Sequence, residues 1–119
     1  MYNCPVELTV EVMGGKWKSR ILWHINKKPY RYGELRKLIP NITQKMLTQA
    51  LRELEEDGLI VRKVFEGNVL KVEYSLTEYG QTTTPLLELM SQWGKNHKHR
   101  IDRLKAEENK VEIHTINKK

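Results

Sequence analysis

The chain has 119 residues, enough for one domain with a modest core and too few for two. Lysine and arginine number 21 against 15 aspartates and glutamates, which gives a formal net charge of +6. There is no run of about 18 apolar residues and no secretory leader, so we expect neither membrane insertion nor export. The single cysteine excludes an internal disulfide and fits a reducing cytoplasm.

Two short helices are expected at the start of the chain. Residues 5–13 form an amphipathic segment with Pro5 at the first helical position and Gly14-Gly15 as its stop. A second helix is expected over residues 17–25, where apolar side chains recur at core spacing: Trp17, Ile21, Leu22 and Ile25.

A short helix followed by a turn is predicted upstream of residue 42. Residues 30–39 supply the helix, and Pro40 and Asn41 end it. We expect Leu35 and Leu38 to pack under the helix that comes next. Helix, short turn and helix together make a helix-turn-helix.

Residues 41–58 carry the strongest functional signal. Thr43 is a good N-cap, Ile42 can pack on Leu47 as a hydrophobic staple, and Gly58 ends the helix. We also expect Thr43 to contact DNA. The apolar stripe of this helix leaves five polar side chains facing out: Gln44, Lys45, Thr48, Gln49 and Arg52.

The chemistry of this outward face suits DNA. Glutamine and arginine make bidentate contacts with adenine and guanine in the major groove, and lysine and threonine bind phosphates or bases. The acids Glu53, Glu55, Glu56 and Asp57 fall in the last turn, as expected if the N-terminal half of the helix approaches a polyanion. The alternative for this segment alone is a solvated amphipathic helix.

A β-hairpin is predicted after the helix. Residues 59–65 and 69–76 are rich in β-branched side chains and flank the turn 66–68. Lys63, Asn68 and Lys71 would lie near its tip, so the hairpin would act as a wing beside the recognition helix.

Basic residues are concentrated over the predicted helix-turn-helix. Between Val12 and Arg52 the only acid is Glu34, whereas the bases are Lys16, Lys18, Arg20, Lys27, Lys28, Arg31, Arg36, Lys37, Lys45 and Arg52. This distribution is typical of phosphate contact, with Arg31 an expected contributor. Charge alone would equally fit a solubility surface or an acidic protein partner.

A long helix is expected after Thr77, with Pro85 kinking it or marking where a shorter turn ends. Its apolar stripe is longer than a core of this size needs: Leu86, Leu89, Met90, Trp93, Ile101 and Leu104. The stripe could cover the domain's own core, but we favour a dimer interface that also includes Leu8.

Enzymatic motifs are absent. The run 14–17 lacks the earlier glycine of a phosphate loop, and Trp17 stands where a serine or threonine would hold magnesium. The histidines have no zinc-site spacing, since His97 and His99 are two apart on a helix. We therefore expect a protein that is not an enzyme and has no metal or cofactor.

Several blocks of the chain resemble the HxlR-type bacterial transcription regulators, which are winged helix-turn-helix proteins distantly similar to the MarR type. The blocks occur in order between about Cys4 and about His97: Cys4-Pro5-Val6-Glu7, Gly14-Gly15-Lys16-Trp17, Arg31-Tyr32-Gly33-Glu34-Leu35, Ile42-Thr43-Gln44-Lys45-Met46-Leu47-Thr48, Leu51-Arg52-Glu53-Leu54-Glu55-Glu56-Asp57-Gly58-Leu59, Val72-Glu73-Tyr74-Ser75-Leu76-Thr77 and Trp93-Gly94. The resemblance implies a homodimer that binds an operator and regulates neighbouring genes. Where the family often has prolines in the wing, this chain has Val69 and Leu70, so we expect a more regular hairpin.

The fold class that follows is α+β and mostly helical. We expect a winged helix-turn-helix with dimerisation helices in residues 1–104 and a polar tail in residues 105–119. The function expected is sequence-specific binding of double-stranded DNA by a homodimer on an inverted repeat. The alternative is a winged-helix module that binds proteins, although that would favour apolar or aromatic anchors on the recognition helix.

Cys4 precedes Pro5, so we expect it at or near the N-cap of the first helix, where the dipole favours a thiolate. HxlR-type proteins include members that sense oxidants or electrophiles through a cysteine in this context. The resemblance thus implies a sensor, whereas the alternative is a small residue that only packs. The sequence identifies no small-molecule effector.

Overall fold

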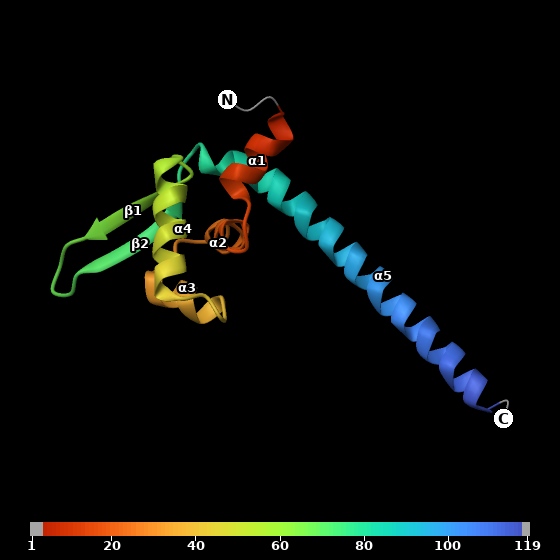
Figure 1. Ribbon diagram of the computed structural model, residues 1–119. Coiled ribbons are helices and arrows are strands. Elements are labelled where there is room, and N and C mark those ends of the chain that lie inside the picture. Colours follow the sequence, from red (N-terminus) through yellow and green to blue (C-terminus); the bar gives the residue numbers. More distant parts are fainter. Residues whose placement is uncertain (1–3, 118–119) are drawn as a thin grey trace. The chain divides into compact units, whose positions relative to one another are not determined.

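The computed structural model describes residues 4–117, with side chains as far as Val111. Its elements are helices apart from one β-hairpin (Figure 1). The chain divides into two compact units between Thr84 and Pro85. The elements are α1 (Pro5–Met13), α2 (Lys18–Ile25), α3 (Tyr32–Leu38), α4 (Gln44–Glu56), β1 (Ile60–Phe65), β2 (Lys71–Leu76), the 3₁₀ turn η1 (Gly80–Thr83) and α5 (Thr84–Asn117). The predicted winged helix-turn-helix fold is confirmed.

Side-chain and glycine caps define both ends of α4. Oγ1 of Thr43 accepts the Met46 N–H at 3.1 Å, which satisfies one of the free amides of the first turn. At the other end Gly58 has a φ of 76°, and its N–H donates to the Glu55 carbonyl at 3.0 Å. The Leu59 N–H donates to the Leu54 carbonyl at 3.0 Å, which completes a Schellman motif.

The core of the first unit lies where α2 packs against α4 and β2. Its largest fully buried side chains come from α2, from α3 and its C-cap, from α4 and from β1: Ile21, Leu22, Leu35, Ile39, Leu47, Leu54 and Ile60. Trp17 lies at the N-cap of α2 and is only half-buried, so it contributes less to this core than its spacing predicted.

The prediction that Leu38 packs under α4 is wrong. Leu38 is 42% exposed, whereas Ile39 is 0% exposed. The chain leaves helical geometry at Ile39, which has φ −113° and ψ 88°, and this change of direction turns the Ile39 side chain into the core. Leu35 and Ile39 therefore supply the contacts expected of Leu35 and Leu38.

The hairpin is less regular than predicted. β1 and β2 are antiparallel, with Phe65 opposite Lys71, so the loop covers residues 66–70. Val69 and Leu70, which the sequence pattern places in the second strand, lie in this loop, and Val69 is 79% exposed. Figure 1 shows the hairpin extending from the side of α4.

Two long-range contacts brace the hairpin at its base. Tyr30 and Tyr74 form a β-bridge with hydrogen bonds of 3.0 and 2.8 Å between their backbones. Oγ1 of Thr77 donates to the Gly58 carbonyl at 2.6 Å and accepts the Gly80 N–H at 2.8 Å. The N-cap of η1 is Tyr79, and α5 starts at Thr84. Pro85 therefore follows a shorter turn, which is one of the two alternatives that the sequence left open.

The second unit consists of α5 from Pro85 onward. Residues 105–117, which the sequence pattern separates as a polar tail, continue this helix. None of the described helices has the length and apolar character needed to cross a membrane.

Candidate nucleic-acid interface

The outward face of α4 brings together the five side chains that its spacing predicted. All are exposed, and they line one shallow hollow of about 510 Å³: Gln44, Lys45, Thr48, Gln49 and Arg52. The opposite face of α4 is in the core, so the helix both supports the domain and displays this surface. Amide, hydroxyl, ammonium and guanidinium groups are those that bind base edges and phosphates.

The start of α4 is held by Tyr32 of α3, a residue that the sequence analysis did not select. The Tyr32 hydroxyl donates to the Gln44 carbonyl oxygen at 3.0 Å and lies 3.1 Å from Oγ1 of Thr48. Thr43, a predicted DNA contact, uses its own oxygen as the N-cap of α4. No local pattern identifies Tyr32, because its partners lie on the next helix.

Arg31 lies at the N-cap of α3, with an exposed side chain. Its backbone N–H donates to Oε1 of Glu34 at 2.9 Å, which orders this helix start. The turn between α3 and α4 includes Asn41 at a φ of 72°, a left-handed conformation that asparagine tolerates. The predicted phosphate contact of Arg31 stays a prediction.

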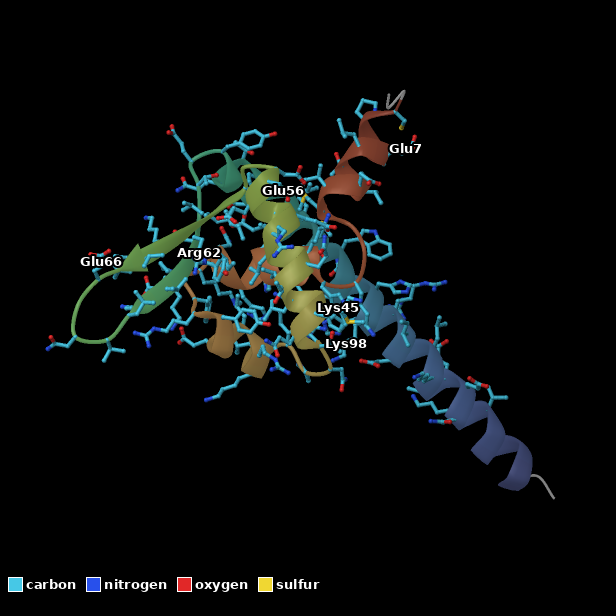
Figure 2. All side chains as sticks on the ribbon, turned by 60° about the vertical axis from the view of Figure 1, so that its left-hand side comes forward. Glu7, Lys45, Glu56, Arg62, Glu66 and Lys98 are labelled. Atoms are coloured by element: carbon cyan, nitrogen blue, oxygen red, sulfur yellow. The ribbon has the colours of Figure 1, made fainter. Side chains whose placement is uncertain are left out.

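Glu53 differs from the other acids of α4. Its Oε2 lies 2.8 Å from Nζ of Lys18 on α2, and its Oε1 accepts from Nε2 of Gln49 at 3.1 Å. The hydrogen bonds from Lys18 and, second, from Gln49 lower the pKa of the Glu53 carboxyl. Glu53 is therefore part of the candidate interface, whereas Glu56 lies at the far end of the helix from Lys45 (Figure 2).

The three predicted wing residues have different environments. Asn68 is exposed in the loop, and Lys63 is exposed on β1 opposite Glu73. Lys71 is paired, because its Nζ lies 2.8 Å from Oε1 of Glu73 and 5.6 Å from the centre of the Phe65 ring. Lys63 and Asn68 are thus freer than Lys71 to meet a phosphate.

Arg62 is a basic residue of the wing that the sequence analysis missed. It is exposed on β1 and lines a hollow of about 250 Å³ together with Arg52 of α4 and Tyr74 of β2. Figure 2 shows Arg62 on the hairpin, away from the Glu66 tip. The only sequence signal for Arg62 was its charge, because register decides which strand residues face α4.

The predicted dimer residues are exposed in the single chain. On α5 these are Leu86, Leu89, Met90 and Trp93, and Trp93 is 69% exposed with its ring stacked on His97 at 5.0 Å between centroids. On α1, Leu8 is exposed. Exposed apolar side chains of this number are typical of an interface.

Cys4 occupies the predicted N-cap of α1 and is an exposed free thiol. Its carbonyl oxygen accepts the Leu8 N–H at 3.1 Å, while its side chain makes no capping hydrogen bond. Among the described residues no group of three or more His, Cys, Asp or Glu side chains is placed to hold a metal ion.

Comparison with known proteins assigns the family. The model of the HxlR-like helix-turn-helix family matches residues 12–102. The chain belongs to this family. Among curated relatives, the uncharacterized HTH-type transcriptional regulator YdeP of Bacillus subtilis (strain 168) is 52% identical over 104 residues, covering 87% of this chain and 81% of YdeP. YtcD of the same organism is 53% identical over 100 residues, covering 84% of this chain and 79% of YtcD.

Solved structures of similar proteins have the same fold. The redox regulator HypR in its oxidized form has a TM-score of 0.75 and 48% identity, covering 78% of this chain and 96% of HypR. The reduced form has a TM-score of 0.78 and covers 83% of this chain. The protein is thus a DNA-binding transcriptional regulator of the helix-turn-helix type.

Proposed function

We propose that this HxlR-like regulator binds an inverted-repeat operator as a homodimer, with α4 in the major groove and the β1–β2 hairpin beside it on the backbone. Base contacts come from Gln44, Gln49 and Arg52, and phosphate contacts from Lys45, Thr48 and the basic residues flanking α4. Because its target is genomic DNA, we place the protein in the cytoplasm.

The observation that carries this proposal is the exposed polar face of α4. Five hydrogen-bonding side chains share one surface of a capped helix, and Tyr32 and Thr43 order its first turn. Helix-turn-helix proteins place the N-terminal residues of the second helix against base edges. No acid of the first two turns of α4 opposes this approach to a polyanion.

Selection of bound duplexes from a random DNA pool tests the proposal. The wild-type chain should recover an inverted repeat, with a Kd on the order of 10⁻⁸ M or tighter at physiological salt. A variant with Gln44, Gln49 and Arg52 all replaced by alanine should lose the preference but keep salt-dependent binding. If the triple variant selects the same sequence as the wild type, α4 does not supply the base contacts.

We propose that the dimer forms through the apolar side chains of α5 and Leu8, with residues 1–104 as the winged helix-turn-helix and its dimerisation helices. Two-fold symmetry would then place the two α4 helices about 34 Å apart, one turn of DNA. The exposure of Leu89, Met90 and Trp93 supports this assignment.

We also propose that Cys4 makes the regulator responsive to oxidants. The solved relative HypR is a redox regulator, and Cys4 is an exposed free thiol here. Two Cys4 thiols would give two electrons and two protons to the oxidant and form an intersubunit disulfide, or one thiol would exchange with a small disulfide. Either product would shift the two α4 helices of the dimer relative to each other and so change the operator affinity.

Operator binding before and after mild oxidant or quinone treatment tests Cys4, with Cys4→Ser as the matched variant. We expect treatment to change the affinity of the wild type, a reducing agent to reverse the change, and the variant to show none. An equal response from both proteins, or no response from either, would exclude Cys4 as the switch.

A further inference from the structure

Three side chains form a continuous hydrogen-bonded chain beside the base-contacting face. Lys18 of α2 donates to Oε2 of Glu53 at 2.8 Å, and Gln49, one turn earlier on α4, donates through Nε2 to Oε1 of Glu53 at 3.1 Å. Lys18 makes a second hydrogen bond, because its Nζ also donates to the Glu11 carbonyl oxygen at 3.4 Å. We propose that Glu53, backed by Lys18, is a positioning residue that sets which way the Gln49 amide faces the DNA.

The donor and acceptor properties of the three groups allow only one arrangement. An ammonium only donates, and an ionised carboxylate only accepts. Glu53 must therefore face Nε2 of Gln49 rather than its oxygen. The Gln49 amide is left with a free Oε1 acceptor and the second Nε2 proton, and adenine presents the matching N6 donor and N7 acceptor in the major groove.

Two physical factors stabilise the hydrogen-bonded series of Lys18, Glu53 and Gln49. The Lys18 side chain is only 16% exposed and the Glu53 side chain 39%, so the ion pair is partly shielded from water. Gln49 and Glu53 are four residues apart on a helix, a spacing that places two side chains side by side. When a duplex covers this face and displaces water, the hydrogen bonds strengthen, because the local dielectric constant falls.

Glu53→Gln inverts the arrangement without changing the size of the side chain. Lys18 still only donates, so the oxygen of the new amide faces Lys18 and its nitrogen faces Gln49. Gln49 must then turn its oxygen toward position 53 and its two protons toward the DNA. Guanine presents two acceptors, N7 and O6, so the variant favours guanine where the wild type favours adenine.

The inference rests on the proposed role of Gln49 in base contact, and one set of measurements separates the two. The probes are the wild-type operator, selected from a random pool, and duplexes with each other base pair at the position that Gln49→Ala ceases to discriminate. Glu56→Gln is the matched control, because it removes the same charge from α4 at an exposed residue whose side chain has no hydrogen bond or ion pair among the described residues.

We expect the wild type to prefer adenine over guanine by about tenfold or more at this position. Glu53→Gln should reduce that ratio about tenfold or reverse it, and Glu56→Gln should leave it unchanged. Both variants should bind all duplexes somewhat more tightly, since each removes a negative charge, so the base preference is the deciding quantity. Adding Lys18→Met to Glu53→Gln should give a protein without either preference.

Two results overturn the inference in different ways. If Glu53→Gln keeps the wild-type preference while Gln49→Ala loses it, Gln49 contacts the base but Glu53 does not orient it. If Gln49→Ala keeps the full preference at every position, the role of Gln49 in base contact fails, and the role of Glu53 fails with it.

Discussion

Lys45 and Arg52 are two cations of α4 to which we assign different roles in the proposed interface. Both are exposed on α4, and neither side chain has a hydrogen bond or ion pair among the described residues. Lys45 lies in the first turn, where the helix amides also attract phosphate. Arg52 lies two turns further on, where its planar guanidinium can make the bidentate contact with guanine that an ammonium cannot.

Substitution should separate these two roles. Lys45→Ala should weaken binding to all duplexes alike and reduce the slope of log K against log salt by about one. Arg52→Ala should cost roughly 1–3 kcal/mol at the selected operator and relax specificity at one base pair. Titrations of operator and unrelated duplexes at several salt concentrations measure both. Equal loss of specificity in the two variants would contradict the assignment of phosphate contact to Lys45 and base contact to Arg52.

At the scale of the element, the boundaries of α4 could be predicted because capping is local. Thr43 and Met46 are three residues apart, and Gly58 at its positive φ follows the C-cap residue of α4, so the signals lie beside the structure they determine. The five exposed residues of α4 could be predicted for the same reason, since helical spacing alone separates them from the buried stripe.

The side chains that depend on distant contacts could not be predicted. Lys18 and Glu53 belong to different helices, and Tyr30 pairs with Tyr74, a residue far from it along the sequence. The wing loop was missed because Val69 has high β-propensity, although strand register places it at the tip. Local pattern carries no information on register or on which helices meet.

Alanine substitutions can test whether Ile39, rather than Leu38, contributes the buried side chain at the end of α3. Ile39→Ala should destabilise the protein by about 2–5 kcal/mol, because it empties a fully buried site, whereas Leu38→Ala should cost less than about 1 kcal/mol. Urea denaturation of both variants gives the two free energies of unfolding. A greater loss in Leu38→Ala than in Ile39→Ala would show that Leu38, not Ile39, completes the core.

At the scale of the whole molecule, the proposed dimer depends on apolar side chains that the single chain leaves exposed on α5. Leu89→Lys and Trp93→Lys should lower self-association and operator affinity together, because an unpaired charge in an apolar interface is costly. Gln92→Lys, which adds the same charge to an exposed polar position on α5, is the control. Sedimentation at tens of micromolar measures self-association. A wild-type protein that is monomeric there and still binds the operator with full affinity would exclude the proposed dimer.

The central claim, that α4 contacts bases in the major groove, is tested most directly by removing acceptors from the DNA. Purine N7 lies only in the major groove, and 7-deaza purines lack it. Single 7-deaza substitutions across the selected operator should weaken wild-type binding by roughly 1–3 kcal/mol at the contacted purines. At the guanine contacted by Arg52, the Arg52→Ala variant should show no further loss. Unchanged wild-type affinity at every substituted purine would contradict the account.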